Sequence, residues 1–198
     1  MELDRSATSL LVLDLQHDIV SSDGALGSHG LGAEVERSGV LERCAKVLQA
    51  ARQASLPVVH VGVEVRDGST VNTSAALLST VVATGALRAG SEGAGFEPRA
   101  RPRSGELVVL KPSVSAFAGT SLDLHLRSAG INHVVLCGVA TNFVVEGTAR
   151  DAVDRGYRVT VLGDACCSFT PAWHDTALEV LAMLAGVTGV DEFVSALG

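Results

Sequence analysis

Short apolar runs alternate along this chain with longer segments in which apolar residues recur at helical spacing. Strands that are covered on both faces are nearly continuous in apolar residues, and strands separated by helices form parallel sheets. The sequence therefore predicts an α/β protein with a parallel sheet. The predicted strands span residues 10–14, 57–63, 107–111, 133–137, 158–162 and, on a weaker pattern, 186–190.

Helical periodicity fills the segments between these runs. Thr120 suits the N-cap of one such segment, and Gly130 suits its end. Two stretches are richer in Gly and Ser, 21–32 and 66–105, and each is either a surface loop or the border of a ligand pocket. The second is too long for an ordinary connection, which predicts a short helix near 73–84. The other predicted helices span residues 33–54, 120–129, 142–155, 171–185 and 191–197.

The composition limits the class of protein. The chain has 198 residues, 47% of them hydrophobic, with no internal repeat or low-complexity linker, so one domain over residues 1–198 is expected. The net charge of −7, with 15 Lys and Arg spread along the chain, argues against nucleic acid or an anionic membrane as a partner. No apolar run approaches the ~20 residues that span a bilayer. The first residues, MELDRSATS, do not resemble a signal peptide, so a cytoplasmic protein is expected.

The cysteines do not form a recognisable metal or redox motif. Cys44, Cys137, Cys166 and Cys167 make no CxxC pair and no Cys/His set with the spacing of a zinc site. Cys137 lies in the apolar run HVVLCGV, which is typical of a buried strand. The sequence therefore favours reduced, structural thiols in a cytosolic protein.

Polar residues stand where several of the predicted strands end. The carboxyl ends of parallel strands border the ligand crevice, so these residues are candidates for a site. Asp14 follows four apolar residues, and burying it is costly unless it is paired or protonated. Lys111 is one of two lysines and follows LVVL, so it needs an anion such as Asp14 or a substrate carboxylate. The alternatives are that Asp14 caps the next turn and that Lys111 is solvated.

Several segments together resemble the isochorismatase-like hydrolase superfamily, which includes isochorismatases, nicotinamidases, and carbamoylsarcosine and maleamate amidases. The resemblance rests on LVLDLQHD, LKPSVSAFAGTS, GVATNFVVEGTARDAVDRGY, and DACCS with His174. It implies a six-stranded parallel sheet with helices on both faces, a Rossmann-like arrangement, and a small-molecule substrate. Homodimers are common in the superfamily, so a homodimer or higher homo-oligomer is expected.

The resemblance also exposes a missing residue. In the amidase branch an aspartate, a lysine and a cysteine act together, and Asp14 and Lys111 fall on the first two positions. The cysteine belongs six residues after the glycine that ends the fourth strand, where a helix N-terminus lowers the pKa of a thiol. Counting from Gly138 leads to Val144, so the nucleophile is absent. The thiol mechanism cannot be carried over unless one of the two adjacent cysteines after the fifth strand replaces it.

Isochorismatases provide a route without a thiol. The resemblance implies that an aspartate protonates an enol ether, water adds to the resulting cation, and pyruvate leaves. Asp14 as the acid and Lys111 as the carboxylate anchor could serve this route. Those enzymes, however, usually have GVYAH where this chain has GVATN.

The turn after the fourth strand supplies further candidates for binding substrate. Val139, Ala140 and Thr141 would cradle an oxyanion or a carboxylate, and in the superfamily the peptide before the residue matching Ala140 is often cis. Gln16 and Phe117 either line the same pocket or only pack.

No metal and no other cofactor are predicted. Nicotinamidases hold a divalent ion through an Asp/His set after the second strand, whereas here His60 lies inside that strand with no second histidine close by. A strand histidine with a satisfied ring is therefore expected at His60. His174 is expected to have a structural role on the face of a helix.

The sequence leads to one principal hypothesis and two alternatives. The first is a hydrolase that acts on a small, anionic metabolite by cysteine-independent acid–base chemistry, with Asp14 as the acid–base and Lys111 as its charge partner. The second is a catalytically silent binding or scaffold protein that kept the fold and lost the thiol at Val144. The third is an amidase that uses Cys166 or Cys167.

Overall fold

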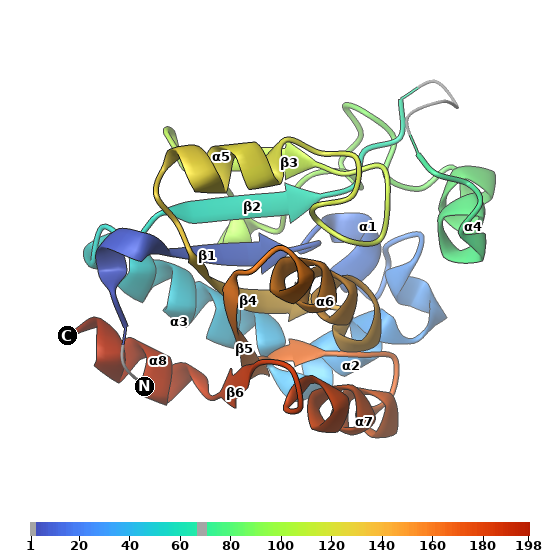
Figure 1. Ribbon diagram of the computed structural model, residues 1–198. Helices are drawn as coiled ribbons and strands as arrows, with labels where there is room; N and C mark the ends of the chain where they lie inside the picture. Colours follow the sequence, from blue (N-terminus) through green and yellow to red (C-terminus); the bar gives the residue numbers. More distant parts are fainter. Residues whose placement is uncertain (1–2, 67–70) are drawn as a thin grey trace.

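The computed structural model describes residues 3–66 and 71–198, and a six-stranded parallel sheet lies at its centre (Figure 1). The strand order is β3-β2-β1-β4-β5-β6, so the chain runs outward from β1 on one side and then continues from β4 on the other. This reversal between β1 and β4 marks the place where sheets of this kind bind ligands, outside the carboxyl ends of the strands. The strands are β1 (Thr8–Leu13), β2 (Val58–Gly62), β3 (Leu107–Leu110), β4 (His133–Val139), β5 (Arg158–Cys167) and β6 (Gly186–Thr188).

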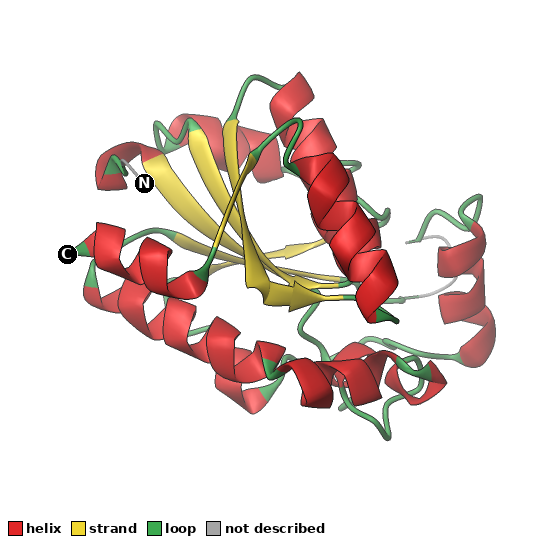
Figure 2. Ribbon diagram, turned by 90° about the horizontal axis from the view of Figure 1, so that it is seen from below, coloured by secondary structure: helices red, strands yellow, loops and turns green. Residues whose placement is uncertain are grey.

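Alternate residues of β1 enter two apolar cores, one on each face of the sheet. Leu10 and Val12 pack into one core and Leu11 and Leu13 into the other, and every residue of β1 is buried. Helices cover both faces, which confirms the predicted architecture (Figure 2). One face carries α2 (Leu31–Ser38), α3 (Val40–Gln53) and α8 (Val190–Leu197), and the other carries α5 (Leu122–Ser128), α6 (Glu146–Asp154) and α7 (Pro171–Leu181).

The single helix predicted over 33–54 is wrong, because two helices, α2 and α3, meet at Gly39. Gly39 has a φ of 66°, in the left-handed region that ends helices, and its N–H donates to the carbonyls of Val35 and Glu36. Both helices pack on the same core, so the apolar spacing alone did not reveal the break.

The fifth strand is longer than predicted and ends at Cys167 rather than at residue 162. A Gly-Asp pair interrupts the apolar run in the sequence, but the strand continues past it. A register irregularity absorbs the extra residues, since Leu136 pairs with Val161 while Gly138 pairs with Cys166. The two adjacent cysteines therefore lie within β5 and not after it.

The other elements agree with the prediction to within a few residues. The helix predicted after β4 begins as a π-helical turn, Thr141–Val145, and continues as α6. The short helix predicted in the second Gly- and Ser-rich stretch is α4 (Ala76–Thr84), and residues 67–70 of that stretch lie outside the described part. α1 (His17–Val20) follows β1 closely. Among the described residues, no helix has both the length and the apolar composition to cross a membrane.

Gly138 allows the ends of β1 and β4 to approach each other. Its φ is 125°, and a Cβ at this position would lie 2.1 Å from the carbonyl oxygen of Leu13. We expect Gly138→Ala to lower the free energy of unfolding by about 3 kcal/mol, the upper end of the cost of a strained backbone. Urea denaturation measures this loss.

Gly130→Ala is the matched control. Gly130 has a similarly left-handed φ of 73°, but no heavy atom lies within 4 Å of the position of its added Cβ. This variant should lose only about 1–2 kcal/mol, the cost of the left-handed backbone alone. Equal losses in the two variants would contradict the role given to the contact between Gly138 and Leu13.

Candidate active site

The ends of β1 and β3 bring Asp14 and Lys111 together. Asp14 follows β1 directly, and its backbone N–H donates to Val61 of β2 at 2.9 Å. Lys111 follows β3, and its N–H donates to Gly62, also at 2.9 Å. Because each residue is bonded to β2, the two side chains are held on either side of that strand's end. The Lys111 Nζ lies 2.9 Å from Asp14 Oδ2 and also donates to the carbonyl of Ser113 at 3.1 Å.

This ion pair is almost completely buried. Asp14 is 6% exposed and Lys111 is 3% exposed, so the alternative of a solvated lysine is wrong. The alternative of Asp14 as a helix cap is also wrong, because α1 has Gln16 at its N-cap position. Burial raises the pKa of Asp14, and the Lys111 ammonium opposes that rise through its charge and its hydrogen bond.

One oxygen of Asp14 has no partner. Oδ1 is buried and accepts no hydrogen bond from the described part of the protein, whereas Oδ2 is bonded to Lys111. A buried acceptor left in this state costs free energy, and a ligand atom that bonds to it would remove that cost. Asp14 therefore has the environment and the free oxygen of a group that can exchange a proton with a ligand.

A cavity of about 310 Å³ adjoins this pair. Val139, at the end of β4, and Ala140 and Val144, from the turn after it, line the cavity together with Asp14 and Lys111. The peptide bond between Val139 and Ala140 is cis, as the resemblance implied. Both Gly- and Ser-rich stretches border the cavity, which resolves the alternatives left by the sequence. Most of the remaining lining is apolar: Ile19, Leu26, Leu31, Val63, Leu77, Leu78, Val81, Leu87, Val114, Phe143 and Phe169.

Val144 occupies the place where the resemblance implies a cysteine. It lies in the π-helical turn at the start of the helix after β4, and it is 2% exposed. Its branched apolar side chain faces the same cavity as Asp14. Within the described residues the cavity lining contains no cysteine or serine, and Thr80 is the lining residue with a hydroxyl group.

Three of the predicted binding residues lie outside this lining. Gln16 uses its side-chain amide to hold backbone, because it donates to Val63 and Ala94 at 2.8 and 2.7 Å and accepts from the N–H of Val63 at 2.7 Å. Of the two alternatives for Gln16, lining the pocket or only packing, these bonds support the second. The sequence does not indicate which backbone groups a glutamine near the end of a strand will bond.

Phe117 and Thr141 are also turned to other contacts. Phe117 packs against Tyr157, with ring centroids 5.7 Å apart, in the core on the side of α5 and α6. The hydroxyl of Thr141 lies 2.8 Å from Nδ1 of His174. The bond fixes the turn after β4 to α7, which agrees with the structural role expected for His174.

The cysteines do not provide a substitute nucleophile at this cavity. Cys166 and Cys167 are 2% and 4% exposed, and neither lines the cavity next to Asp14. Burial raises the pKa of Cys167 to about 11 and also raises the pKa of Cys166 well above its ordinary value. Buried thiols with raised pKa values are poor nucleophiles at neutral pH. All four cysteines are free and buried.

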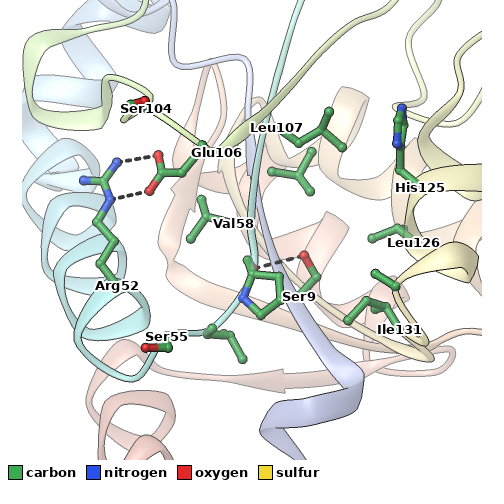
Figure 3. A pocket seen from close by; sticks show the side chains of 15 residues that line it. Ser9, Arg52, Ser55, Val58, Ser104, Glu106, Leu107, His125, Leu126 and Ile131 are labelled. Carbon is green, nitrogen blue, oxygen red and sulfur yellow. Dashed lines mark hydrogen bonds and ion pairs between the residues drawn. The ribbon is translucent and has the colours of Figure 1, made fainter.

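A second hollow, of about 520 Å³, lies near the amino ends of the strands (Figure 3). Arg52 and Glu106 form a two-pronged ion pair at its edge, with distances of 2.7 and 2.8 Å. The pKa of Glu106 is lowered to about 2, and the hydrogen bond from the Arg52 guanidinium is the largest cause. The hollow lies at the amino ends of the strands, whereas sheets of this kind bind ligands outside the carboxyl ends, so we assign the candidate site to the cavity at Asp14.

His60 contacts the same carboxylate as Arg52. Its Nε2 is 2.9 Å from Glu106, but its Nδ1 has no hydrogen-bond partner among the described residues, so the expectation of a fully satisfied ring is wrong for one of the two nitrogens. Within the part of the chain that the structure describes, no three His, Cys, Asp or Glu side chains are grouped as metal ligands.

The six-stranded parallel sheet with helices on both faces is the fold of the isochorismatase-like hydrolases. The Isochorismatase domain family matches residues 8–192, and the chain therefore belongs to the isochorismatase family. It is 32% identical over the full length of both chains to an uncharacterized isochorismatase family protein, YecD, of Escherichia coli O157:H7. It is 34% identical to the ureidoacrylate amidohydrolase RutB of Methylobacterium radiotolerans, over 99% of this chain and 81% of that protein.

Solved structures show the same fold. A cysteine hydrolase from Pseudomonas syringae pv. phaseolicola superposes with a TM-score of 0.88 at 26% identity, over 100% of this chain and 95% of that one. An N-carbamoylsarcosine amidase from Thermoplasma acidophilum superposes with a TM-score of 0.72 at 28% identity, over 96% of this chain and 98% of that one.

Proposed function

We propose that this isochorismatase-family hydrolase acts on a small metabolite in the cavity at Asp14 by acid–base chemistry, without a thiol nucleophile. The observation that carries the proposal is the buried pair of Asp14 and Lys111, with Asp14 Oδ1 free beside a cavity that has Val144 in place of a nucleophile. A raised pKa suits a carboxyl group for proton transfer near neutral pH.

The chemistry follows from the two charges. A protonated Asp14 would give its proton to a basic or leaving atom of the substrate, and the Lys111 ammonium would stabilise the carboxylate that forms. Water would then attack the activated substrate, and the proton it releases would return to Asp14. Before the transfer, neutral Asp14 and charged Lys111 carry a net positive charge, which favours an anionic group or a developing negative charge on the substrate.

A second candidate is a binding protein without turnover. The apolar side chain of Val144 favours it, because this position offers no nucleophile to a substrate in the cavity. The retained ion pair favours the enzyme, since buried ion pairs are weak contributors to stability.

The test is a set of possible substrates offered to the wild type and to the double variant Cys166→Ala/Cys167→Ala. Isochorismate, ureidoacrylate, N-carbamoylsarcosine, maleamate and nicotinamide are assayed by release of pyruvate or ammonia. We expect turnover of at least one compound, at rates within about threefold in the two proteins, because the buried thiols take no part. Turnover that disappears in the double variant would establish a relocated thiol. Compounds that bind in calorimetry but are not turned over would establish the binding protein.

A further inference from the structure

The walls of the cavity at Asp14 contain few polar side chains. Among the described residues that line it, polar side chains belong to Asp14, Lys111, His29 and Thr80, and the rest are apolar. Its aliphatic wall includes side chains that are themselves buried, each no more than 3% exposed: Leu31, Leu78, Val81 and Leu87. A polar substituent placed against this wall would lose its hydrogen bonds to water and gain none from the protein.

Aromatic side chains extend the apolar lining toward the surface. Phe143 and Phe169 both line the cavity, with ring centroids 6.1 Å apart in an edge-to-face arrangement. Phe169 in turn contacts Trp173, at 6.2 Å, and Trp173 is 52% exposed. These rings add apolar surface to one side of the cavity.

The cavity is too large to be filled by a ligand as small as urea or acetamide. An apolar protein cavity of ~150 Å³ accepts a benzene molecule. The cavity here, at about 310 Å³, has room for a ring or for a chain of several carbons together with a polar group. Oδ1 of Asp14, which has no partner among the described residues, is the atom to which such a polar group can hydrogen-bond.

From these observations we propose that the ligand has an apolar body, aliphatic or aromatic, and a single polar group that reaches Asp14. The position of the polar group at Asp14 rests on the proposed function. The inference adds to that function the chemical class of the substrate. A molecule with polar groups at both ends, such as maleamate, would leave one of them against the aliphatic wall, so nicotinamide, an aromatic ring with one amide group, fits this class best among the substrates assayed above.

A series of straight-chain primary amides tests the proposal by calorimetry. Binding of butanamide, pentanamide and hexanamide to the wild type should tighten by about fourfold for each added methylene, with an increasingly negative heat capacity change. Adipamide, which replaces the methyl end of hexanamide with a second neutral amide group, should bind at least about tenfold more weakly than hexanamide. Affinity that is independent of chain length, or equal affinities for hexanamide and adipamide, would overturn the proposal.

Variants of two leucines on short helices test whether the amides bind in this cavity. Leu77 of α4 lines the cavity and is 37% exposed, while Leu124 of α5 is 67% exposed and does not line it. Both lie in the first turn of their helices, where an aspartate is tolerated. Leu77→Asp should weaken hexanamide binding by about tenfold and Leu124→Asp by less than about twofold. Equal effects of the two variants would overturn the assignment to this cavity.

These results separate the two proposals. Chain-length dependence without release of ammonia or pyruvate from any compound would support the apolar ligand class and count against the hydrolase. Turnover of the substrate set without chain-length dependence would support the hydrolase and overturn the ligand class.

Discussion

Replacing Lys111 by methionine is expected to lower the free energy of unfolding by about 3–5 kcal/mol, because it leaves the charge of Asp14 buried without a partner. Methionine has a length similar to that of lysine and fills the same space, so little of this loss should come from packing. The Lys111 Nζ is the only described group bonded to a side-chain oxygen of Asp14, and both residues are less than 10% exposed. Urea denaturation followed by circular dichroism measures the change.

The double variant Asp14→Asn/Lys111→Met is the control for charge. It removes both charges, and replacement of a whole buried pair is often neutral for stability. We expect it to recover most of the stability that Lys111→Met loses. A double variant as unstable as the single one would show that the loss comes from packing and not from an unpaired charge.

The contribution of Asp14 and Lys111 to stability depends on pH, and the direction of the pKa shift gives the sign of that dependence. The pKa of Asp14 is raised above its ordinary value of 3.8 by burial, with Lys111 opposing the rise. A raised folded-state pKa means that the folded protein binds the proton more tightly, so the contribution to stability is present at low pH and is lost as pH rises through the folded pKa. Without Lys111 the rise is unopposed. The cost of Lys111→Met should therefore be larger at about pH 8 than at about pH 5.

Much of the fold and the centre of the site could be predicted from local patterns. The apolar runs that end at Asp14 and Lys111 predict strands, and parallel strands place their carboxyl ends at one edge of the sheet. A buried carboxylate and a buried ammonium at that edge each need an opposite charge, so their pairing follows from electrostatics alone.

The features that could not be predicted depend on contacts between distant segments. Gln16 bonds to the backbone of Val63 and Ala94, and only the folded chain brings these residues together. The extension of β5 to Cys167 depends on an irregular pairing with β4, which leaves no periodic pattern in the sequence. The sequence leaves open whether Phe117 lines the pocket or only packs, because the contact of its ring with Tyr157 joins segments that are distant in the sequence.

Replacing Asp14 by asparagine is expected to reduce kcat/KM by about 10²–10⁴-fold, the usual contribution of a general acid–base group. Asparagine keeps the shape of the side chain but cannot transfer a proton at neutral pH. It also leaves the buried Lys111 ammonium without its carboxylate, so the variant should be less stable than the wild type. Rates are therefore measured at a temperature where circular dichroism shows both proteins to be folded.

The most direct test of a thiol-independent acid–base hydrolase compares initial rates of three folded proteins on one substrate: the wild type, Asp14→Asn, and Cys166→Ala/Cys167→Ala. We expect the aspartate variant to lose turnover and the cysteine variant to keep it, because Asp14 lines the cavity while both thiols lie outside it. Turnover retained by Asp14→Asn, or lost with the two cysteines, would contradict the assignment of the chemistry to Asp14.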